Sequence, residues 1–142
     1  MRGVGAWGVK ALESDEGLEV VALVGEVSYG RAEVTADELV NAVRSEGLLG
    51  DDPAADEYLY DVTALALAEI LTGDTAQLAD PTFGQTVFVP TPEGIAVLVT
   101  WLTRLYGAGV NREFLELRSS DPRHSVHLTT VIGALGRIQD AR

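Results

Sequence analysis

TPEGIAVLVTWLTRLYG, residues 91–107, is the most apolar stretch long enough to form a helix, and it decides the fold. Thr91 can accept a hydrogen bond from a first-turn amide, Pro92 suits the first helical position, and Gly107 ends the helix. Val97 and Trp101 widen the apolar surface, so we expect neighbours on more than one side. The large apolar residues recur at three- and four-residue spacing, which places them on one helix face: Ile95, Leu98, Val99, Leu102, Leu105 and Tyr106.

A second core helix is predicted over residues 53–71, because Asp51-Asp52-Pro53 is a typical helix opening and Gly73 stands just past the end. Its apolar stripe comprises Leu59, Val62, Ala66 and Ile70, broadened by Leu65 and Leu67. The following connection, residues 73–90, contains a β-prone piece at residues 86–89. Pro90 keeps that piece at the edge of a sheet or out of one altogether.

Four other helices are predicted from their caps or their apolar residues. Ser14 opens the first, with an inner face of Leu18, Val21 and Val24. Thr35 and Glu38 form a capping box for the second, which turns Leu39, Val40 and Val43 inward and ends at Gly47. Asp121-Pro122 begins the last, whose inner face is Leu128, Val131, Leu135 and Ile138, and residues 111–117 form a shorter one before it.

These elements predict a mainly α fold. We expect one compact domain over residues 1–142, a bundle of five to six helices with one short extended segment near 86–89. The helices at residues 92–106 and 53–71 occupy its centre. The chain contains no internal repeat and no linker long enough to divide it.

The charge balance is the most unusual bulk property. Ten Lys and Arg residues stand against 22 Asp and Glu residues, a formal net charge of −12. Such a surface repels phosphate backbones and anionic membranes, so we expect neither nucleic acid nor a membrane as partner. The absence of cysteine excludes disulfides and thiolate metal sites. Without an apolar signal run, a cytoplasmic location is expected.

The opening of the chain resembles a known family. GAWG at residues 5–8 is followed by LESD at 12–15 and GLE at 17–19. This order resembles the start of a family of short bacterial proteins of unknown function, which begin Met-Gly-x-Trp-Gly and continue with Phe-x-Asn-Asp. The residues that carry it are Gly5, Trp7, Gly8, Ser14 and Asp15, and the chain departs from it at Leu12, Ser14 and Glu19. The resemblance implies a mostly helical bacterial domain and assigns no activity. Because Val4 stands where family members begin, we expect residues 1–3 to precede the native start.

The densest group of charges precedes and opens the helix predicted over residues 53–71. It comprises Asp51, Asp52, Asp56, Glu57 and Asp61. Carboxylates four residues apart repel along a helix unless something positive lies between them. A basic protein partner or a hard metal ion would supply that charge. The ordinary alternative is a capped, solvated helix start. Tyr58 and Tyr60 would add an aromatic rim to a binding surface, or lie half-buried at the edge of the core.

His124 and His127 are the only histidines, three residues apart on the last helix. Two imidazoles at that spacing can hold a transition metal if a carboxylate joins them. No Glu lies between them as a metalloprotease would require, so positions at the core boundary or near the helix start are the alternative. Trp7 and Trp101 are expected to anchor the core. No serine-hydrolase or phosphate-loop motif is present.

These observations favour a non-enzymatic, cytoplasmic interaction module that presents an acidic surface to a basic protein partner, with no cofactor. Neutralisation of a basic toxin, an immunity-like role, is one concrete version. Two alternatives remain open. One is a metal-binding domain or metal-dependent enzyme that uses the cluster between Asp51 and Asp61 or the two histidines. The other is a homodimeric structural protein that pairs through the final helix or residues 111–117.

Overall fold

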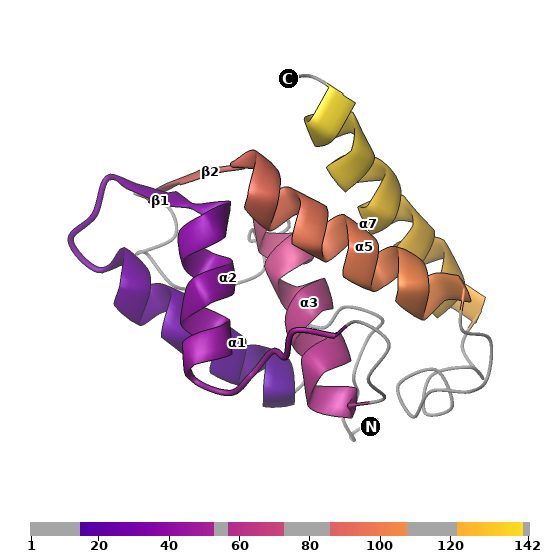
Figure 1. The fold of residues 1–142 in the computed structure, drawn as a ribbon, viewed down its shortest axis with the longest axis horizontal. Coiled ribbons are helices and arrows are strands. Elements are labelled where there is room, and N and C mark those ends of the chain that lie inside the picture. Colours follow the sequence, from indigo (N-terminus) through magenta and orange to yellow (C-terminus); the bar gives the residue numbers. More distant parts are fainter. Residues whose placement is uncertain (1–14, 53–56, 73–85, 108–121, 141–142) are drawn as a thin grey trace.

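The computed structural model describes residues 15–52, 57–72, 86–107 and 122–140. Within them the chain forms five helices and two short strands (Figure 1). In chain order these are α1 (Asp15–Ser28), β1 (Glu33–Thr35), α2 (Ala36–Ser45), α3 (Tyr58–Leu71), β2 (Val87–Val89), α5 (Pro92–Gly107) and α7 (Pro122–Asp140). The predicted mainly α fold is confirmed. The motif at residues 5–8 and the helix predicted at residues 111–117 lie outside the described residues.

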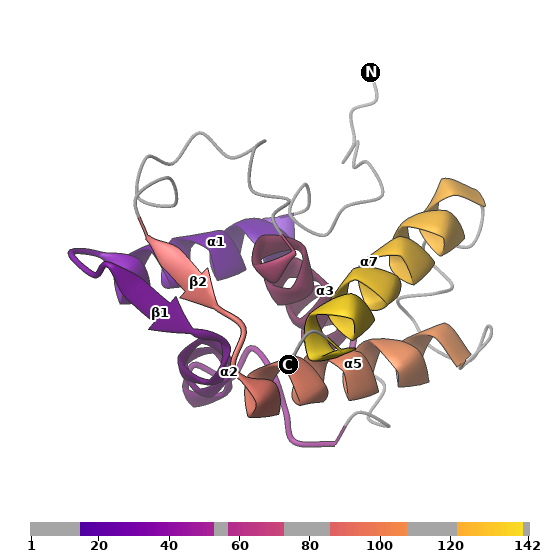
Figure 2. The same cartoon turned by 90° about the horizontal axis from the view of Figure 1, so that it is seen from above.

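Helix α3 lies at the centre, with α1 on one side and α5 and α7 on the other (Figure 2). Residues 61–70 are all buried, because neighbouring helices cover every side of this segment. The sequence predicted α3 as the second core helix after α5, and α3 is the more completely buried of the two. Alanines at 64, 66 and 68 contribute to this burial, since short side chains allow neighbouring helices to approach closely.

The predicted start of α3 was wrong. The helix begins at Tyr58 rather than at residue 53, and Glu57 before it has extended backbone angles, φ −125° and ψ 113°. The segment DDPAADE, residues 51–57, contains no large apolar side chain. Asp51, Asp52 and Glu57 are exposed, and the apolar stripe that buries α3 begins after them.

Helix α1 turns the predicted face to the core only in part. Its buried residues are Gly17, Val20, Val24 and Ser28. Val24 was predicted correctly, but Leu18 is 52% exposed and Val21 is half-buried. Helix α1 contacts both α3 and α2, so its buried stripe serves two neighbours rather than one.

The capping box of α2 is confirmed in both directions. The Thr35 hydroxyl accepts from the Glu38 amide at 3.1 Å, and a Glu38 carboxylate oxygen accepts from the Thr35 amide at 2.8 Å. The predicted inner face of Leu39, Val40 and Val43 is buried. The helix ends at Ser45, and Gly47 adopts the left-handed φ of 77° that reverses the chain.

Strands β1 and β2 pair in parallel, with Glu33 opposite Val87 and Thr35 opposite Val89. The extended piece predicted at residues 86–89 is therefore β2, whereas β1 is too short for its sequence pattern to predict. β1 leads directly into α2, and β2 leads into α5 through two residues. Parallel pairing thus brings the first turns of α2 and α5 together (Figure 2).

Helices α5 and α7 largely follow the predicted faces. Ile95, Leu98, Leu102 and Leu105 of α5 are buried, as are Leu128, Val131 and Leu135 of α7, and Ile138 packs against them. Tyr106 was predicted inward but is 49% exposed, because it lies at the edge of the buried stripe in the last turn of α5. On α7, Val126 is a large apolar side chain that stays exposed. None of the helices in the described ranges has both the length and the apolar character needed to cross a bilayer.

Candidate functional site

The predicted acidic cluster is divided by the fold. Asp51 and Asp52 lie in the connection after α2, Glu57 lies directly before α3, and all three are exposed. The Asp51 side chain has 95% of its surface open to solvent. Asp56 lies outside the described residues. We refer to Asp51, Asp52 and Glu57 as the acidic segment.

Asp61 does not belong to this exposed surface, so its prediction as a partner-binding residue was wrong. It lies in the first turn of α3 and is completely buried. One of its carboxylate oxygens, Oδ1, accepts a hydrogen bond of 3.0 Å from the indole nitrogen of Trp101 on α5. A buried carboxylate needs such donors, because it has lost its hydration. Trp101 is itself buried, which confirms its prediction as a core anchor.

The two tyrosines at the start of α3 are half-buried and pack against the core. The Tyr60 ring meets the Trp101 indole edge to face, with 6.2 Å between ring centroids and 80° between planes. Tyr60 also lies against the backbone of Gly50, where a Cβ atom would come within 2.7 Å of the ring. Tyr60 thus fixes the path of the chain just before the acidic segment.

A small pocket opens where the chain leaving α2 passes α5. It has a volume of about 240 Å³, and its lining is mainly apolar. It is formed by Arg44, Asp51, Ala96, Val97, Thr100 and Trp101. Nothing in the sequence pattern joins these residues, because α2, the connection and α5 meet only through tertiary packing.

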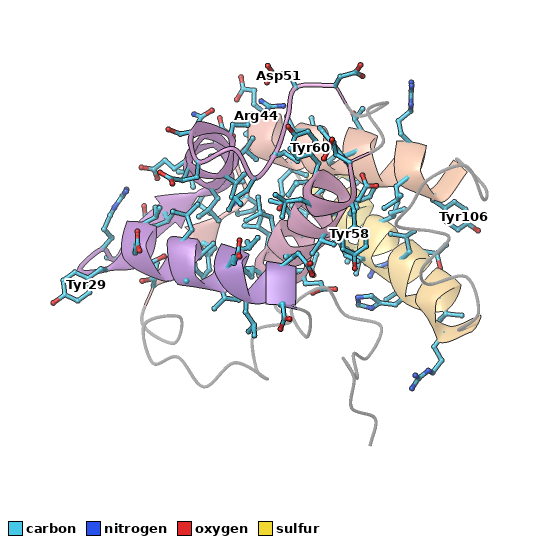
Figure 3. All side chains as sticks on the ribbon, turned by 90° about the horizontal axis from the view of Figure 1, so that it is seen from below. Tyr29, Arg44, Asp51, Tyr58, Tyr60 and Tyr106 are labelled. Atoms are coloured by element: carbon cyan, nitrogen blue, oxygen red, sulfur yellow. The ribbon has the colours of Figure 1, made fainter. Side chains whose placement is uncertain are left out.

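Arg44 forms the polar rim of this pocket. Its Nε donates to the Gly50 carbonyl at 3.2 Å and lies 3.4 Å from Asp51 Oδ1. Figure 3 shows the Arg44 and Asp51 side chains together at the edge of the molecule, near Tyr60. The Arg44 side chain is 30% exposed and borders the pocket.

His127 contacts a buried carboxylate on α3. Its Nε2 lies 2.7 Å from Oε2 of Glu69, a completely buried residue of α3, and the imidazole itself is mostly buried. The His124 side chain lies outside what the structure describes. Nowhere in the described ranges do three or more His, Cys, Asp or Glu side chains gather where a metal ion could be held.

Asp37 joins the first turns of α2 and α5. Its Oδ1 accepts from the Thr91 hydroxyl at 2.5 Å and from the Gly94 amide at 2.6 Å. The sequence predicted Thr91 as the residue that caps α5, but the Gly94 amide donates to Asp37. The Thr91 hydroxyl bond is the main cause that holds the pKa of Asp37 below its usual value. The pKa of Glu38 is also lowered, chiefly by the backbone amide of Thr35.

Comparison of the chain with protein-family models, with curated proteins and with solved structures gives no match.

Proposed function

We propose that this chain is a protein-interaction module whose acidic segment binds a basic protein partner. The observation that carries the proposal is the exposure of the segment. The Asp51 side chain is 95% open to solvent. Asp52, in the same connection after α2, and Glu57, directly before α3, are exposed as well. The overall charge of −12 adds a long-range attraction for a basic partner.

The roles of Asp51 and Glu57 within the fold are small. The contact between Asp51 and Arg44 is 3.4 Å long and lies at the surface, where ion pairs contribute roughly 0–1 kcal/mol. Glu57 occupies the N-cap position of α3, but its side chain makes no capping hydrogen bond. Because stability requires little of these carboxylates, their placement is better explained by binding.

One specific version is the neutralisation of a basic toxin in a bacterial cytoplasm. Charge complementarity in such a complex raises the association rate and selects among partners more than it raises affinity. Binding of this kind weakens as salt screens the exposed charges, over a Debye length of about 8 Å at physiological ionic strength.

The test is affinity capture from a lysate of the organism that encodes the chain, at low and moderate salt. The wild type is compared with the triple variant Asp51→Asn, Asp52→Asn, Glu57→Gln. A matched control, Asp15→Asn, Glu19→Gln, Glu26→Gln, removes the same charge from exposed positions of α1. The proposal predicts a basic protein that wild type and control retain, that the first variant loses, and that leaves as salt rises. If both variants lose the captured protein equally, binding depends on the net charge of the chain and not on the acidic segment, and the proposal is wrong.

A further inference from the structure

The pocket beside Asp51 is small enough to suggest what enters it. Sites for drug-sized ligands usually measure roughly 300–1,000 Å³, and this one measures about 240 Å³. A space of that size suits a single side chain. Asp51 is one of the residues that line the pocket. A partner's side chain that enters the pocket would therefore place the neighbouring residues of the partner next to the acidic segment.

The lining of the pocket indicates the type of side chain. Ala96, Val97 and Trp101 supply apolar wall, and the guanidinium of Arg44 lies at the rim. Guanidinium groups stack on aromatic faces and are attracted by their negative quadrupole. An aromatic ring therefore satisfies both the apolar wall and the cation, whereas an aliphatic side chain satisfies only the wall.

We propose that this pocket receives one aromatic side chain of the basic partner, whose adjacent basic residues contact Asp51 and Asp52. The inference rests on the proposed function and names the anchor of the same interface. Aromatic side chains seated in well-packed pockets are typical of the residues that dominate binding energy. A second copy of this chain is disfavoured as occupant, because two molecules of charge −12 repel each other.

Short synthetic peptides separate the aromatic anchor from the charge attraction. The probes are acetyl-Lys-Phe-Lys-amide, the same peptide with alanine or leucine at the centre, and acetyl-Glu-Phe-Glu-amide. Binding to the full chain is measured by nuclear magnetic resonance, from shifts of the Val97 methyl groups and the Trp101 indole. We expect the phenylalanine peptide to bind about tenfold more tightly than the alanine peptide, because it buries a phenyl ring. We expect the leucine and glutamate peptides to bind less tightly than the phenylalanine peptide.

A pair of variants tests the location. Ala96→Phe fills the pocket from its exposed wall and should remove the preference for phenylalanine over alanine. Thr103→Phe adds the same ring at an exposed site two turns further along α5, outside the pocket lining, and should keep the preference. Both positions are exposed, so neither substitution disturbs the core.

Each contrary result has a distinct meaning. If the phenylalanine and alanine peptides bind equally, or if no peptide binds, the anchor pocket is wrong while the acidic segment is still tested by capture. If the leucine peptide binds as well as the phenylalanine peptide, the aromatic assignment is wrong. If the glutamate peptide binds as tightly as the lysine peptide, the pocket stands and the proposed function fails.

Discussion

Replacing Gly94 with alanine tests the junction where α2 and α5 begin. A Cβ atom at this position would lie 2.6 Å from the carbonyl carbon of Ala36 and 2.7 Å from the amide nitrogen of Asp37. Both are backbone atoms, held by the β1–β2 pairing and the capping box of α2. The two helices must therefore move apart, which weakens the hydrogen bond from Gly94 to Asp37.

The expected cost is the balance of three effects. Overpacking a tight contact costs about 1–3 kcal/mol, and weakening a hydrogen bond to a carboxylate costs roughly 1.5–3 kcal/mol. Alanine is preferred over glycine in a helix by about 0.5–1 kcal/mol, which opposes the loss. We expect the free energy of unfolding of Gly94→Ala to fall by about 2–4 kcal/mol.

Urea unfolding followed by far-ultraviolet circular dichroism measures this change. The control is Gly136→Ala on α7, where a Cβ atom would meet no described atom within 4 Å. In that substitution only the helical preference for alanine over glycine acts, so we expect the protein to be stabilised by about 0.5–1 kcal/mol. The two alanines should thus act with opposite sign. A Gly94→Ala protein as stable as the Gly136→Ala protein would refute the close approach of α2 and α5.

Three further predictions concern side-chain hydrogen bonds that join different helices. Trp101→Phe removes the indole donor to buried Asp61 and should cost about 1–3 kcal/mol beyond the lost packing, measured by urea unfolding against Asp61→Asn in a double-mutant cycle. His127→Ala removes the imidazole that contacts completely buried Glu69 and should cost about 1–3 kcal/mol, whereas Glu69→Gln should cost less, as thermal unfolding would show. The stabilisation from the lowered pKa of Asp37 is complete above the pKa of the unfolded chain and is lost as pH falls through the folded pKa. Asp37→Asn should therefore flatten the acid side of a plot of unfolding free energy against pH, and an unchanged slope would contradict this role.

The sequence predicted elements whose signals are local. The capping box at Thr35 and Glu38 satisfies its own amides, so three residues of spacing suffice to identify it. The end of α3 at Leu71 and the inner face of α7 follow from apolar spacing in one segment. Prediction failed where a neighbouring element decides the outcome. The exposed Leu18 is one such case, because the contacts of α1 with α2 and α3 decide which of its residues are buried.

The candidate site divides in the same way. The exposure of Asp51 was predicted, because acidic residues in a segment without large apolar side chains remain in water. Asp61 was grouped with the same run of carboxylates, yet it is buried and accepts a hydrogen bond from Trp101 on another helix. The pocket at Arg44 was not predicted for a similar reason. Its lining residues come from α2, from the connection after it and from α5, and only the fold brings these segments together.

The most direct test of the central claim is the association rate of the captured partner, measured by stopped flow over a range of ionic strengths. Electrostatic steering raises such rates by about tenfold or more, and salt removes the gain. We predict a steep salt dependence for the wild type and for the α1 control variant Asp15→Asn, Glu19→Gln, Glu26→Gln. We predict a flatter one when the acidic segment Asp51, Asp52 and Glu57 is neutralised. Equal salt dependence in the two variants would contradict the claim that this segment guides binding.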